Sequence, residues 1–168
     1  MSRKKKFFFT TVSVFLLLTH AALSQAKIEG VWKYAEVVVP GKNSAEKDTT
    51  ITNPQPGLII FTKSYYCTVA VYEPRAAVAP AKDPKNLTDA EKIARYEQWR
   101  PFAANAGTYE IQGSTIVRHP IVTKNVGNMT RGTPSFQEFK LEGPNTLWLL
   151  PTAGTPATEP RVKLTRLE

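Results

Sequence analysis

The sequence has few cysteines and histidines, and this scarcity excludes whole classes of site. Cys67 is the single cysteine in 168 residues, so no disulfide can form within the chain. Of the two histidines, His20 lies in an N-terminal apolar run and His119 is the one beyond it. A zinc site built from cysteine and histidine is therefore excluded. We expect neither a metal nor a cofactor in this protein.

The chain also lacks basic runs beyond its first residues. Arg3, Lys4, Lys5 and Lys6 account for half of the formal net charge of +8, and no later basic run exceeds two residues. Nucleic-acid binding is therefore not expected. The strand glutamates are isolated from one another, and no paired-carboxylate, His-x-x-x-His or Gly-x-Ser-x-Gly pattern exists. The sequence accordingly assigns no catalytic residues.

Residues 1–26 have the three parts of a secretory signal peptide. Met1–Lys6 is basic, Phe7–Leu18 is mostly apolar, and Ser24-Gln25-Ala26 offers small residues before a cut. Polar residues interrupt the apolar run, which favours cleavage over a retained membrane anchor. We expect cleavage between Ala26 and Lys27, a secreted or periplasmic mature protein, and membrane contact only through the signal peptide.

The remaining residues, 27–168, read as one domain of short strands with a single inserted helix. Turn residues separate alternating or β-branched segments. Thr88 and Glu91 form a capping-box pattern that predicts a helix start, and Ile93 and Tyr96 share a face that we expect to lie over or beside the barrel. The segment 102–106 reads as an irregular turn. The predicted strands are 31–39, 58–62, 65–73, 108–112, 115–123, 136–141, 146–150 and 161–167.

Eight antiparallel strands in up-and-down order favour a closed barrel, because closure removes exposed strand edges. A barrel of this size is either filled by its own side chains or holds one small ligand. A β-sandwich built from the same strands is the alternative fold. The predicted fold class is therefore all-β, an eight-stranded antiparallel up-and-down barrel with the helix between its third and fourth strands.

Gly30-Val31-Trp32 is a Gly-x-Trp motif at the start of the first predicted strand, and further motifs follow it in order along the chain. Over residues 29–167 this set resembles the bacterial and fungal lipocalin-like domain family of the calycin superfamily, whose signature is Gly-x-Trp. Asn105 replaces the aromatic residue that usually begins the family's Tyr-Ala-Gly-x-Tyr stretch. The further motifs are Gly57–Thr62, Tyr65–Glu73 with Pro74-Arg75, the capped helix, Asn105–Ile111, Val117–His119 and Leu164–Arg166.

The resemblance implies a barrel that is closed at one end by a tryptophan and an arginine. In lipocalins an arginine from the last strand packs on the signature tryptophan. Trp32 is therefore expected under Arg166, or otherwise Arg161, with Gly30 beside it. Such barrels host carriers, inhibitors and a few enzymes, so the fold alone does not set the function.

Aromatic residues suggest a ligand cavity inside the barrel. Tyrosines offer an apolar ring and a polar tip, which suits a small, largely apolar guest. The residues expected to contact it are Tyr66, Tyr72, Tyr109 and His119, if the even-numbered side chains of segment 65–73 face inward. The predicted function is ligand binding. The alternatives are a barrel enzyme of the isomerase or cyclase type acting on a hydrophobic substrate, and a structural or interaction domain with a filled core.

Overall fold

The computed structural model describes residues 28–42, 45–75, 77–81, 83–130, 132–152, 154 and 159–168. The expected signal peptide, residues 1–26, lies outside the described residues. No helix in the described part is long and apolar enough to cross a membrane. The elements are β1 Gly30–Val39, β2 Thr49–Ile51, β3 Gly57–Phe61, β4 Tyr65–Val71, α2 Asp89–Trp99, β5 Phe102–Gln112, β6 Thr115–Thr123, α3 Val126–Thr130, β7 Ser135–Leu141, β8 Thr146–Leu150 and β9 Arg161–Arg166.

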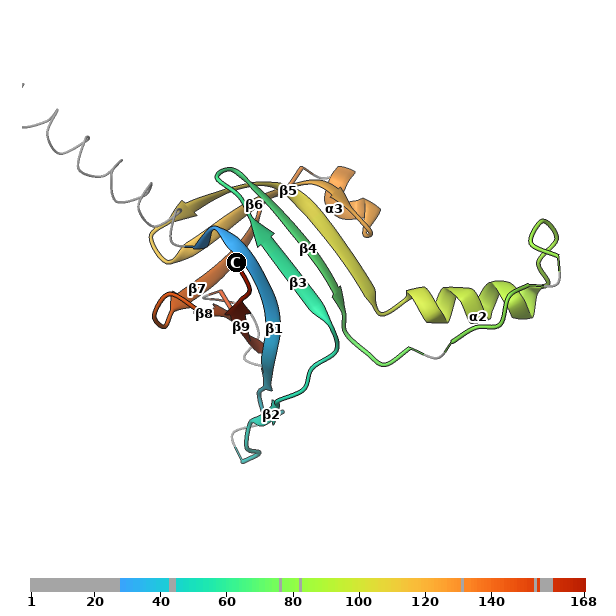
Figure 1. Cartoon of the computed structure of the whole chain (residues 1–168), viewed down its shortest axis with the longest axis horizontal. Helices are drawn as coiled ribbons and strands as arrows, with labels where there is room; N and C mark the ends of the chain where they lie inside the picture. The colour runs from blue at the N-terminus through green and yellow to red at the C-terminus, as the bar shows by residue number, and fades with distance from the viewer. Residues whose placement is uncertain are drawn as a thin grey trace, which may run out of the picture.

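Eight of these strands form a closed antiparallel barrel (Figure 1). From β3 to β9 each strand pairs with the next one in sequence, and β1 pairs with both β3 and β9. The β1–β9 ladder closes the ring and excludes a two-sheet sandwich. β2 is a three-residue strand that pairs with the C-terminal part of β1, residues Val37–Val39. The predicted fold class is confirmed, with α2 between the third and fourth barrel strands.

Three local features of the polypeptide differ from the sequence prediction. β5 begins at Phe102, whereas residues 102–106 were expected to form an irregular turn. Ala103, Ala104 and Ala106 have weak strand propensity, and pairing with β4 overrides it. β2 and α3 lie in segments for which no strand or helix was predicted. Both elements are short and appear within polar stretches that carry no clear periodicity.

The inward-facing side chains fill one end of the barrel. Along each strand, alternate residues point to the interior. Toward one end these residues are large and almost completely buried, and they pack into a continuous apolar core. They include Trp32, Phe61, Tyr109, Ile111, Ile116, Phe139, Leu147 and Leu164. This end therefore has the filled interior that a structural barrel would show.

Helix α2 begins as predicted but does not pack as predicted. The Thr88 side chain accepts the Glu91 amide, and the Glu91 carboxylate accepts the Thr88 amide at 2.8 Å, so the capping box is formed. However, no residue of α2 is buried, and Ile93 and Tyr96 remain 63% and 65% exposed. Figure 1 shows the helix projecting away from the barrel. The inward-facing apolar side chains of the closed barrel pack against one another, so this core does not need a helix to cover it.

Candidate ligand-binding site

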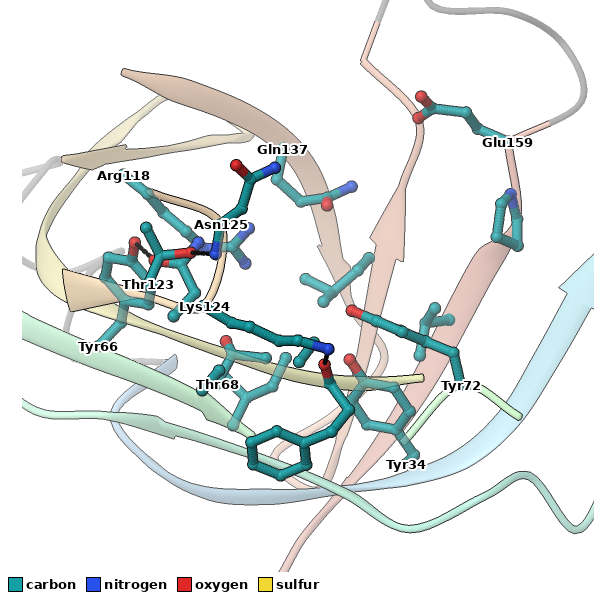
Figure 2. Close-up of a pocket in the computed structure, with 18 of the residues that line it drawn as sticks. Tyr34, Tyr66, Thr68, Tyr72, Arg118, Thr123, Lys124, Asn125, Gln137 and Glu159 are labelled. Carbon is teal, nitrogen blue, oxygen red and sulfur yellow. Dashed lines mark hydrogen bonds between the residues drawn. The ribbon is translucent and has the colours of Figure 1, made fainter. Parts of the chain in front are cut away.

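The other end of the barrel holds a cavity of about 620 Å³ (Figure 2). Its inner wall includes buried residues such as Ile59, Tyr66 and Leu149, and its mouth is bordered by exposed residues. The residues around it are Tyr34, Ile59, Tyr66, Thr68, Tyr72, Arg100, Phe102, Ala103, Ala104, Asn105, Arg118, Thr123, Lys124, Asn125, Gln137, Leu149, Glu159, Pro160 and Val162.

The same strands that fill one end leave space at the other. Strand β1 contributes Trp32 to the core and Tyr34 to the cavity, and β6 contributes Ile116 to the core and Arg118 to the cavity. Strand β5 lines the cavity with small residues, Ala103 and Asn105 among them. Gly57 makes room for the Tyr34 ring, because a Cβ on Gly57 would lie 2.8 Å from Tyr34 Cγ. The short side chains of β5 thus leave space in this half of the barrel, and Gly57 allows the Tyr34 ring to lie close to the β3 backbone.

Arg118 is the most unusual group in the cavity. Its Nε and Nη2 are shut off from solvent and have no hydrogen-bond partner among the described residues. Its Cζ lies 5.5 Å from the Tyr66 ring centroid, so the guanidinium stacks on an aromatic face. Burial lowers the pKa of Arg118, and the side chains that oppose this shift are the tyrosines Tyr66, Tyr34 and Tyr72. The cation remains protonated at neutral pH. Among the described residues it forms no ion pair with a carboxylate, although Glu159 borders the same cavity.

Three tyrosine side chains surround the cavity. The Tyr66 hydroxyl donates to Asn105 Oδ1 at 2.7 Å, which joins β4 to β5 across the inner wall. Burial raises the pKa of Tyr34 strongly, and the neighbouring Tyr72 side chain adds to this shift. Burial also raises the pKa of Tyr66. Tyr34 and Tyr66 therefore stay neutral at physiological pH, and all three tyrosines carry a hydroxyl group that can hydrogen-bond a guest.

The two other cations at the cavity are already engaged. Arg100 makes ion pairs with Glu73 at 2.8 Å and with Glu97 at 3.0 Å. Lys124 Nζ donates to the carbonyl oxygens of Trp99, Arg100 and Phe102 (Figure 2 shows one of these bonds). An ammonium has three donors, so these carbonyls use all of them. Lys124 thereby fixes the chain where α2 passes into β5.

The structure places two of the four predicted contact residues at the cavity. Tyr66 is buried in its inner wall, which settles the parity of segment 65–73: the even-numbered side chains face inward. Tyr72 lies just past the end of β4 and borders the cavity near its mouth while remaining 63% exposed.

Tyr109 and His119 do not line the cavity, which corrects the sequence expectation. Tyr109 faces inward but belongs to the filled end, where its ring packs edge-on against Phe61 and its hydroxyl donates to Thr62 O at 2.7 Å. His119 faces outward, because its neighbour Arg118 faces inward on the same strand. The His119 ring is 3.9 Å from Glu110 Oε1 on the outer surface.

Sequence reasoning missed Arg118 and Tyr34. The signal for Arg118 was its spacing of two residues from Ile116, which puts both side chains on one face of the strand. Val117 and His119 share the opposite face, however, and both faces carry an apolar residue. The sequence therefore did not say which face was interior. For Tyr34 the interior face was equally undetermined, because the apolar run Val37–Val39 that follows it does not alternate with polar residues.

The closed end contains the other residues singled out from sequence. Arg166 Cζ lies 4.2 Å from the centroid of the Trp32 ring, and Arg166 rather than Arg161 occupies this position. Trp32 Nε1 donates to Ile28 O at 2.8 Å. Gly30 has a φ of 131°, and a Cβ there would collide with the Glu168 carbonyl, so this backbone position requires glycine.

Within the described residues, no group of three or more histidine, cysteine, aspartate or glutamate side chains is arranged to hold a metal ion.

Comparisons with known proteins place this architecture in a family. No curated protein matches the sequence. A solved structure of a redesigned beta barrel is similar, with 13% sequence identity and a TM-score of 0.37 over 88% of this chain and 96% of that chain. The model of the lipocalin-like domain matches residues 29–161, which is most of the sequence. This chain belongs to the lipocalin-like domain family.

Proposed function

We propose that this protein is exported and binds one small, largely apolar molecule in the open end of its barrel. The observation that carries the proposal is the cavity of about 620 Å³ beside a completely filled half. Small-molecule sites in proteins commonly have volumes of 300–1,000 Å³. A barrel that served only as a structural unit would have no need to leave this space open.

The lining suits a guest with an apolar body and a polar group. Ile59, Phe102, Leu149 and Val162 provide apolar contact, and the tyrosine hydroxyls provide hydrogen bonds. Burial of roughly 300 Å² of apolar surface contributes about 7 kcal/mol before the cost of association. This apolar contribution by itself gives micromolar or weaker binding, and hydrogen bonds to the ligand would strengthen it.

A neutral fluorescent probe tests this function. N-phenyl-1-naphthylamine should show saturable enhancement of its emission, with one probe per chain. Two matched variants locate the site: Thr68 lines the cavity, whereas its neighbour Val69 points outward and is 40% exposed. Thr68→Phe should weaken binding about tenfold by filling the cavity, and Val69→Phe should leave it unchanged. His119→Ala should also leave it unchanged, because this side chain lies on the outer surface.

A non-saturable probe response, or equal losses in Thr68→Phe and Val69→Phe, would contradict the proposal. Circular dichroism on each variant separates a filled cavity from an unfolded barrel.

Export is supported by the three-part pattern of residues 1–26. N-terminal sequencing of the protein recovered from outside the cytoplasm should begin at Lys27. A mature protein that begins at Met1 would contradict this part of the proposal.

A further inference from the structure

The cavity contains a charge that the protein does not neutralise. Arg118 Nε and Nη2 are inaccessible to solvent and lack partners among the described residues. The side chains that act on its charge are Tyr66, Tyr34 and Tyr72, and none of these is a carboxylate. A buried cation without a counter-ion is costly, and proteins normally pair it.

The charged group of Arg118 faces the cavity. Figure 2 shows the Arg118 guanidinium pointing toward the interior of the cavity. Arg118 Cζ lies over the Tyr66 ring, 5.5 Å from its centroid, so a cation–π contact holds the group from one side. Protein atoms cover Nε and Nη2, and the third nitrogen, Nη1, is not among these covered atoms. Nη1 therefore carries the donors that a carboxylate in the cavity can reach, through charge-assisted hydrogen bonds.

The other charges at the cavity indicate how much negative charge the guest carries. Arg100 is paired with Glu73 and Glu97, and the three donors of Lys124 are used by backbone carbonyls. Glu159 stands at the mouth. Among the described cavity residues, Arg118 is thus the cation that neither a carboxylate nor a backbone carbonyl engages. One guanidinium matches one monoanionic group better than it matches a dianionic phosphate.

We infer that the physiological ligand is a small amphipathic monocarboxylate, held with its carboxylate on Arg118 and its apolar body between the cavity walls. This inference rests on the proposed function, because it names the class of molecule that the same cavity takes. The two phenols Tyr34 and Tyr72 lie along the route from the mouth and can hydrogen-bond a polar substituent on the body of the ligand.

Displacement of N-phenyl-1-naphthylamine by decanoic acid, 1-decanol and decyl phosphate tests the inference at pH 7.5. The acid and the alcohol have the same chain and differ in head group. In Arg118→Gln, displacement by decanoate should weaken about 10- to 100-fold, since charge-assisted hydrogen bonds are lost. Displacement by 1-decanol should change less than twofold. Arg118→Lys should recover part of the loss, because it restores the charge without the paired donors.

A matched control removes an arginine elsewhere. Arg95→Gln, on the projecting helix, should bind decanoate as the original protein does. Equal effects of Arg118→Gln on acid and alcohol, or no effect on the acid, would overturn the inference. Tighter binding of decyl phosphate than of decanoate would also overturn it. If the neutral probe binds but the acid gains nothing from Arg118, the proposed function stands and this inference fails. If no probe or competitor binds, both fail.

Discussion

The guanidinium of Arg166 lies over the indole ring of Trp32, with 4.2 Å from Cζ to the ring centroid. These residues belong to the last and first strands, and they are also direct partners in the β1–β9 ladder. Arg166 donates in addition to the carbonyl oxygens of Glu29 and Pro144. One side chain therefore fastens the point where the barrel closes.

Arg166→Ala should lower the free energy of unfolding by about 2–4 kcal/mol. The cation–π contact contributes about 0.5–2 kcal/mol and each hydrogen bond about 1 kcal/mol. Urea denaturation followed by circular dichroism measures the loss. Arg161→Ala is the control, since Arg161 sits on the same strand and pairs with exposed Asp48. Similar losses in the two variants would show that the Trp32 contact adds no stability.

Thr88→Ala should destabilise helix α2 by about 1 kcal/mol and leave the barrel nearly unchanged. The capping box satisfies two amide donors at the helix start. Because no residue of α2 is buried, the helix can open without opening the barrel. Hydrogen exchange of the amides in residues 92–99 should accelerate, while amides of β1 and β9 keep their rates. An equal loss of protection in the barrel would show that α2 is coupled to it.

Tyr34→Phe should make the protein less sensitive to alkali. A tyrosine whose folded pKa is raised contributes stability that is complete below its unfolded pKa of about 10 and is lost as the pH rises toward the folded value. The slope for one such group is up to about 1.4 kcal/mol per pH unit. Urea unfolding between pH 9 and 11.5 should therefore show a shallower loss for Tyr34→Phe than for the exposed control Tyr65→Phe. Identical slopes would exclude a buried neutral phenol.

Arg118→Met should stabilise the ligand-free protein by about 1–3 kcal/mol, because it replaces an uncompensated buried charge with an apolar side chain of similar length. Thermal denaturation should show a rise of several degrees in Tm. Gln137→Met, which lines the same cavity without carrying a charge, is the comparison. A lower Tm for Arg118→Met would mean that the stacking on Tyr66 outweighs the desolvation of the charge.

The sequence by itself determined the class of fold and much of its order. Alternating β-branched segments separated by glycine and proline turns gave the strands, and Thr88 with Glu91 gave the helix start, because both signals depend on residues close together in the chain. The contact between Trp32 and a late arginine joins distant residues, and it was expected from the resemblance to lipocalins together with the requirement that the first and last strands meet when a barrel closes.

The tertiary structure alone decided which faces are interior. Segments 65–73 and 115–123 carry apolar residues on both faces, so only pairing with neighbouring strands shows that Tyr66 and Arg118 point inward and His119 points out. The strand character of residues 102–106 likewise comes from the β4 ladder rather than from their own propensities. A cavity depends on which side chains meet across the barrel. Strand alternation repeats every two residues, so an error of one position exchanges Arg118 for His119 as the side chain that faces the cavity.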